Sequence, residues 1–266
     1  MSVYMKFFDV NCEIFHTILT PYTWVAFAWE ELRDRYKRSI IGLLWIPIAF
    51  LLFVGVKVLV FSKLNSVGLE VFTIHVVVGY WIWQSINSTI IDSCNVFVRS
   101  GGFIKSSPLP YTVYILQGIF RNGVPFFYNF IIVFATIWLV TGRPNWSLFW
   151  VFPIFLIFFL NSIWLGMFLG VMAARFRDIL HFTQTVMRLL FFLTPIIWMP
   201  EQLGRLGQTI AFYNPIAHFI SIVRTPVSTG TIPLTSWIIV FSVTFVGWFI
   251  GLHTYAKTKR SIVHWI

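Results

Sequence analysis

The stretch EELRDRYKR, from Glu30 to Arg38, is followed almost at once by the apolar run IIGLLWIPIAFLLFVGVKVLVF, from Ile40 to Phe61. Seven of the nine residues in the first segment are charged, which is a quarter of all the charge in the chain. The second segment is long enough to cross the roughly 30 Å hydrocarbon core of a bilayer as a helix. This junction predicts a membrane protein in which the charged segment lies at the membrane surface and the apolar run enters the bilayer.

Composition extends this prediction to the whole chain. Of the 266 residues, 58% are hydrophobic and only 11% are charged, which leaves too little polar surface for a soluble globule. Six stretches approach the ~20 residues that a spanning helix needs: Ile40–Phe61, Val71–Val98, Thr112–Val140, Leu148–Met172, Phe182–Trp198 and Trp237–Tyr255. We therefore predict an all-α membrane protein with a six-span domain over residues 40–266 and an N-terminal segment of residues 1–39.

The N-terminal segment contains an amphipathic helix, here called the interface helix. Pro21 suits its first turn, and apolar side chains recur at spacings of three and four on one face: Tyr22, Val25, Trp29, Leu32 and Tyr36. Its charged residues include Glu30, Arg33, Arg35 and Arg38. We expect the helix to lie in the membrane interface; a soluble helix packed on a partner is the alternative.

Basic residues are distributed unevenly between the two sides of the predicted membrane. With both termini cytoplasmic, twelve basic residues fall on the inner side: Lys6, Arg33, Arg35, Lys37, Arg38, Arg99, Lys105, Arg175, Arg177, Lys257, Lys259 and Arg260. Only four fall outside: Lys63, Arg143, Arg205 and Arg224. This bias predicts cytoplasmic termini. The net charge of +10 is then a topology signal and an attraction for anionic lipids rather than a nucleic-acid surface.

A polar stripe runs along the second predicted span. Its members follow spacings of four, four and three, with Asn87 alongside: Gln84, Ser88, Asp92 and Asn95. In hydrocarbon such a stripe must face another helix or an aqueous path. The neighbouring rings of Tyr80, Trp81 and Trp83 could stack on sugars, although aromatic residues also line lipid and the membrane interface.

Charged residues inside the spans need partners. For Asp92 we expect a buried ion pair with Arg121 or Arg188 rather than a direct role in transport. Lys57 lies close enough to the first outer loop to extend its amine outward. Arg121 also begins a sequence, RNGVP, that predicts a break or kink in the third span at Pro125.

Small residues and prolines mark further features. Ser162, Gly166, Gly170 and Ala174 form a face for close helix packing, a theme that Gly247 and Gly251 repeat. The segment from Pro200 to Ser236 is apolar yet interrupted, which predicts two short re-entrant outer helices between the fifth and sixth spans. The segment from Arg99 to Tyr111 holds two glycines and two prolines, which predicts a cytoplasmic loop.

Catalytic and nucleotide-binding signatures are absent from the sequence. The stretch Gly101–Ser106 lacks the glycine before lysine that a phosphate-binding loop requires, and the six histidines have no metal-ligand spacing. The acids are spread over separate segments. We therefore expect no enzyme activity, no metal site and no cofactor on this chain.

The order of these parts resembles the permease subunit of type-2 ABC exporters. The resemblance rests on RDRYKRSIIGLLW (Arg33–Trp45), ARFRDI (Ala174–Ile179), TPIIW (Thr194–Trp198) and YNP (Tyr213–Pro215), spaced through six spans. It covers nearly the whole chain. Among these exporters the chain is most similar to the polysaccharide-export branch, and above all to the O-antigen transporters.

The resemblance implies a homodimer in the bacterial inner membrane with two copies of a separate cytoplasmic ATP-binding subunit, which holds ATP and Mg²⁺. It also implies a lipid-linked polysaccharide as the substrate. The chain itself would contact membrane lipids and would bind no nucleic acid. Two cytoplasmic segments would couple to the ATP-binding subunit, through Arg99, Lys105, Pro108 and Pro110 and through Arg175, Arg177 and Asp178. The alternatives are an exporter of capsule, teichoic acid, a small lipid or a drug, a membrane-embedded glycan-lipid transferase, and a plain channel, which would not depend on ATP.

Overall fold

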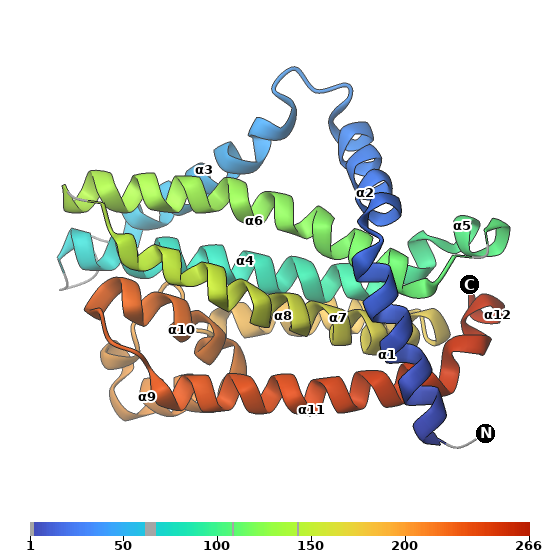
Figure 1. The fold of residues 1–266 in the computed structure, drawn as a ribbon. Helices are drawn as coiled ribbons and strands as arrows, with labels where there is room; N and C mark the ends of the chain where they lie inside the picture. Colours follow the sequence, from blue (N-terminus) through green and yellow to red (C-terminus); the bar gives the residue numbers. More distant parts are fainter. Residues whose placement is uncertain (1–2, 62–67, 108, 143) are drawn as a thin grey trace.

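A computed structural model describes residues 3–61, 68–107, 109–142 and 144–266 (Figure 1). These residues form helices and connections, and no strand occurs among them. In chain order the α-helices are α1 Val3–Leu19, α2 Pro21–Tyr36, α3 Trp45–Phe61, α4 Leu69–Arg99, α5 Gly101–Ser106, α6 Tyr111–Thr141, α7 Val151–Arg175, α8 Asp178–Leu193, α9 Gly204–Tyr213, α10 Pro215–Thr229, α11 Leu234–Thr258 and α12 Ile262–Trp265. Short 3₁₀ turns are η1 Gly42–Leu44, η2 Trp146–Trp150, η3 Pro200–Leu203 and η4 Lys259–Ser261.

Five helical segments of the described chain are long and apolar enough to cross a membrane: Gly42–Val60, Leu69–Ser106, Tyr111–Thr141, Trp146–Arg175 and Leu234–Trp265. The prediction of an all-helical membrane protein is confirmed. The fifth predicted span, Phe182–Trp198, corresponds to α8, whose 16 residues extend about 24 Å and fall short of the hydrocarbon core.

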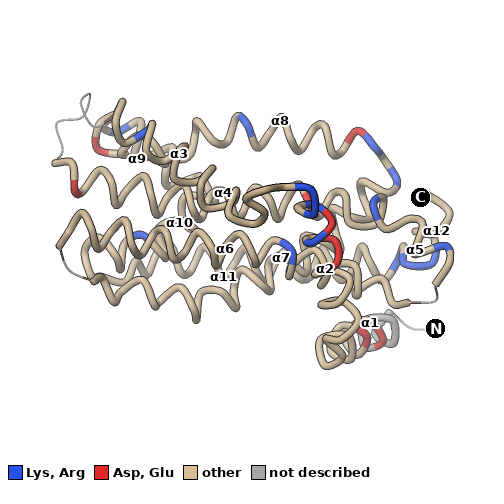
Figure 2. Tube along the Cα trace, turned by 90° about the horizontal axis from the view of Figure 1, so that it is seen from above, with Lys and Arg blue, Asp and Glu red and all other residues tan. Residues whose placement is uncertain are grey.

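Helix α4 lies at the centre of the bundle, in contact with α3, α6, α7, α8 and α10. Figure 1 shows α4, α6, α7, α8 and α11 running side by side, with both termini at one end and α9 and α10 at the other. Helices α1 and α2 run across the bundle near the end that holds the termini. Many of the lysines and arginines gather at this end too, and we call it the basic end (Figure 2).

Close packing by small residues holds the spans together, as the sequence predicted. A Cβ atom on Gly166 would lie 2.8 Å from Ile115, and one on Gly170 would lie 2.6 Å from Val96. A Cβ atom on Gly247 would lie 2.3 Å from the ring of Trp164. Because atoms cannot approach so closely, these glycines set the spacing of α7 against α4, α6 and α11.

Three local features of the structure were not predicted, or were predicted differently. The segment before Pro21 folds as α1, and Val10 and Ile14 pack into the core at the basic end. Part of the predicted loop after the second span is helical, as α5. Of the break or kink predicted at Pro125, the break does not occur, since α6 runs on through that residue. A proline removes only one hydrogen bond from a helix whose neighbours hold it in place.

Candidate functional site

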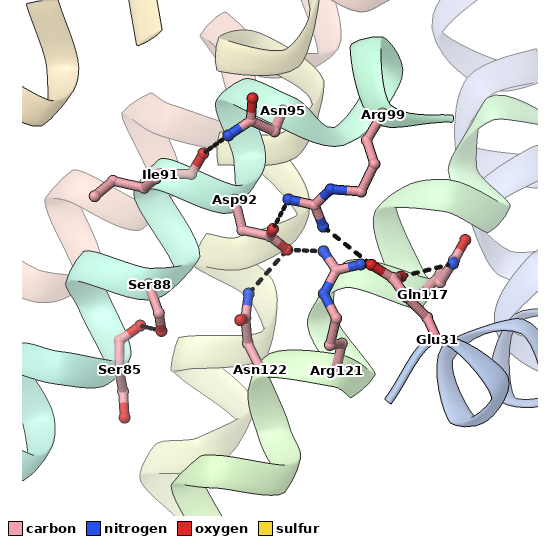
Figure 3. A network of polar contacts seen from close by, with 10 residues as sticks. All are labelled: Glu31, Ser85, Ser88, Ile91, Asp92, Asn95, Arg99, Gln117, Arg121 and Asn122. Carbon is pink, nitrogen blue, oxygen red and sulfur yellow. Dashed lines mark hydrogen bonds and ion pairs between the residues drawn. The ribbon is translucent and has the colours of Figure 1, made fainter. Parts of the chain in front are cut away.

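Four charged side chains from three helices meet near the basic end (Figure 3). Asp92 of α4 forms ion pairs with Arg121 of α6 and with Arg99 of its own helix, the latter at 2.6 Å. Glu31, on the interface helix α2, pairs with Arg121 and lies 3.5 Å from Arg99. We call Glu31, Asp92, Arg99 and Arg121 the ionic network. It ties the interface helix to the second and third spans.

Neutral side chains complete the hydrogen bonds of the network. The amide of Gln117 donates to Glu31 at 3.1 Å, and the amide of Asn122 donates to Asp92 at 3.2 Å. Gly118 leaves room for these groups, since a Cβ atom there would lie 3.2 Å from Asp92. These hydrogen bonds matter because burying a charged group is costly unless ion-pair and hydrogen-bond partners surround it.

The predicted ion pair of Asp92 is confirmed with Arg121, whose side chain is 5% exposed. Arg188, the other candidate, is exposed on α8 and donates to the carbonyl of Gln184 at 3.3 Å. The choice follows from position, because α6 packs beside α4 along most of its length. The part played by Glu31 was missed, since sequence spacing cannot relate α2 to α6.

The polar residues in the middle of α4 are half-buried. Gln84 accepts a hydrogen bond from Asn129 at 3.4 Å, and the hydroxyl of Ser88 bonds the carbonyl of Ser85 at 3.0 Å. Asn87 has no hydrogen-bond partner among the residues described. These side chains can therefore offer hydrogen bonds to a ligand without unfolding the helix.

Two small cavities follow α4 between α6 and α7. Their volumes are about 10 and 40 Å³, and Thr89, Asn122 and Ser162 line both. These volumes suit water molecules rather than a sugar.

The three aromatic residues near this stripe have different surroundings. Trp81 is fully buried and donates from its indole nitrogen to the carbonyl of Phe126, so it packs the core in this conformation. Trp83 is also buried and meets Phe191 edge-on. Tyr80 is half-buried and stacks on Phe53, with ring centroids 4.0 Å apart.

The predicted coupling residues lie at the basic end. Arg175, Arg177 and Asp178 are exposed at the turn from α7 to α8, and Arg175 lies over the ring of Trp265. Lys105 and Pro110 are exposed on either side of the turn after α5, whereas Pro108 lies outside the described residues. Arg99 faces the ionic network instead.

A second polar cluster at the basic end was not predicted. Glu13 of α1 forms an ion pair with Lys259 and accepts hydrogen bonds from Thr112 and Tyr255, each at 3.2 Å. It thereby joins α1 to the start of α6 and the end of α11. No periodic pattern in the sequence relates these three positions.

Comparison with protein families identifies the fold. The model of the ABC-2 type transporter family matches residues 22–227, from the interface helix to α10. The chain belongs to the ABC-2 type transporter family. The match includes the ionic network, the polar middle of α4 and the turn from α7 to α8.

Two relatives share most of their length with this member of the family. Both are named O-antigen export system permease protein RfbA, from Klebsiella pneumoniae, and they are 25% and 24% identical to this chain. Each alignment spans 231 residues, or 86% of this chain and 89% of the relative. The resemblance to O-antigen permeases is thus confirmed at low identity.

Proposed function

We propose that this chain is the transmembrane subunit of an ATP-driven exporter that secretes a lipid-linked, O-antigen-like polysaccharide across the bacterial inner membrane. The observation that carries the proposal is the alignment with two permeases named for O-antigen export over 86% of the chain. The half-buried amides and hydroxyls in the middle of α4 support it, because a glycan needs hydrogen-bond partners along its route.

The active assembly is a homodimer with two copies of a cytoplasmic ATP-binding subunit, which holds ATP and Mg²⁺. Membership in an ABC transporter family supports the ATP-binding partner. The exposed side chains of Lys105, Arg175 and Arg177 at the basic end suit contacts with that partner. ATP binding would move these segments and open the route between subunits.

The topology has six crossings, with α8 and the turn from Thr194 to Met199 forming the fifth. This turn adds the length that α8 lacks. Helices α9 and α10 re-enter from the outer side, and both termini are cytoplasmic. The position of α9 and α10 at the end opposite the termini supports this arrangement (Figure 1).

Deleting the gene in its own host tests the function. The polymer should then accumulate inside the cell, still attached to its lipid, and disappear from the surface, and a plasmid copy should reverse both effects. Normal surface polymer in the deletion strain would exclude the proposal.

The route is tested by Ser88→Leu, with Ser242→Leu as a matched control. Both hydroxyls bond a carbonyl of their own helix, but Ser88 lies in the middle of α4 and Ser242 is exposed on α11. We expect Ser88→Leu, and likewise Gln84→Leu, to slow export several-fold with normal assembly. Export at the control's rate from both would show that this stripe only packs helices.

A further inference from the structure

Lys57 turns into the protein instead of outward. It lies one turn before the end of α3 at Phe61, a depth from which lysine side chains usually reach water. Its side chain is nevertheless only 8% exposed, so the expectation of an outward amine is wrong. Within the described chain its Nζ atom has no hydrogen-bond acceptor and no carboxylate at ion-pair distance.

Three aromatic rings surround this ammonium group. Its Nζ atom lies 3.8 Å from the ring centroid of Phe53, 4.2 Å from that of Phe191 and 5.0 Å from that of Tyr80. The rings come from α3, α8 and α4. We call Lys57 and these three residues the lysine cage.

The cage leaves the charge only partly compensated. Cation–π contacts stabilise an ammonium group, but they satisfy none of its three N–H donors. In surroundings of low dielectric, those donors favour an anion far more strongly than they would in water. The surface beside the cage is apolar, since Val56 of α3 and Phe192 of α8 are largely exposed. An anion carried on a lipid can therefore reach the cage from the membrane.

We propose that Lys57 binds the phosphate group of a membrane lipid in the outer half of the bilayer. Phe191 moves aside as the phosphate arrives, and the rings close on the ammonium group when it leaves. The choice of lipid rests on the proposed function. The favoured lipid is the exported substrate, in which a phosphate or diphosphate joins the glycan to its lipid.

Native mass spectrometry of the purified full-length chain in detergent tests this site. The probes are a long-chain polyprenyl diphosphate, a phosphatidylglycerol and the uncharged polyprenol. Wild type should retain the diphosphate over the polyprenol, and Lys57→Met should weaken retention about tenfold or more, whereas Lys57→Arg should preserve it. Lys257→Met is the matched control. It removes the same positive charge, but from a lysine that is exposed at the basic end.

The two phosphate probes identify the source of the ligand. Loss of the diphosphate alone in Lys57→Met supports a substrate site, and equal loss of phosphatidylglycerol supports a site for lipid phosphates in general. Unchanged retention in Lys57→Met, or no preference of wild type for diphosphate over polyprenol, overturns the proposal. The latter comparison needs no variant to fold. Failure of the export test with intact Lys57-dependent binding would instead refute the proposed function alone.

Discussion

Arg121 lies between two carboxylates, one from the interface helix and one from α4, with 5% of its side chain exposed. Among the described residues its charge is compensated by these two carboxylates, which also contact Arg99. Removing Arg121 leaves Asp92 and Glu31 charged, with Arg99 as the one remaining basic partner of both, and losing the partner of a buried charge costs more than the pair contributes. The network is thus more sensitive to a single substitution than its position near the basic end suggests.

We predict that Arg121→Leu destabilises the protein by about 3–5 kcal/mol. Arg188→Leu, which removes the same side chain from an exposed site on α8, should change stability by about 0.5 kcal/mol or less. Thermal unfolding of the purified protein in detergent measures both. Equal effects of the two variants would mean that Asp92 does not depend on Arg121.

At the scale of elements, α1 is held against the bundle by Glu13, whose side chain is 11% exposed. Thr112 and Tyr255 donate to one of its oxygens and Lys259 pairs with the other. This cluster fixes the ends of α6 and α11 to a helix that crosses them.

Glu13→Ala should loosen α1 by roughly 1.5–3 kcal/mol, because three donors lose a charged acceptor. Hydrogen exchange should then rise across α1 and leave the middle of α4 unchanged. Asp9→Ala serves as control, since Asp9 is an exposed carboxylate on the same helix. Identical hydrogen exchange in the two variants would contradict the conclusion that Glu13 holds α1 against the bundle.

The contact of α7 with α11 depends on a missing side chain. Because a Cβ atom on Gly247 would lie 2.3 Å from Trp164, Gly247→Ala should cost about 1–3 kcal/mol in thermal stability. Gly123→Ala, where the new atom meets nothing within 4 Å, should be neutral or slightly stabilising. A neutral Gly247→Ala would show that the two helices can move apart at little cost.

For the whole molecule, hydropathy and small-residue spacing predicted the helical membrane fold, because both follow from local pattern. The contact of Glu31 with Arg121 and that of Glu13 with Tyr255 could not be predicted, since they join residues 90 and 242 positions apart. Lys57 shows a further limit. The sequence pattern predicts that a lysine near the end of a span extends its amine outward, whereas the structure places the amine of Lys57 among aromatic rings.

The six-span topology predicts where reporter fusions will be active. Fusions after Ile266 and within residues 100–110 should report cytoplasmic locations, and fusions within residues 200–236 should report the outer side. An outer location for the C-terminus would require either an odd number of crossings or an inverted orientation, and both contradict the arrangement.

The most direct test of the central claim is transport by the purified assembly. The chain and its ATP-binding subunit would be reconstituted in liposomes loaded with the host's lipid-linked polysaccharide, and movement of the glycan across the bilayer would be followed with an impermeant glycosidase. We predict transfer that requires ATP hydrolysis and stops when the phosphate-loop lysine of the partner is replaced. Transfer at the same rate without ATP, or none with an active partner, would contradict the account.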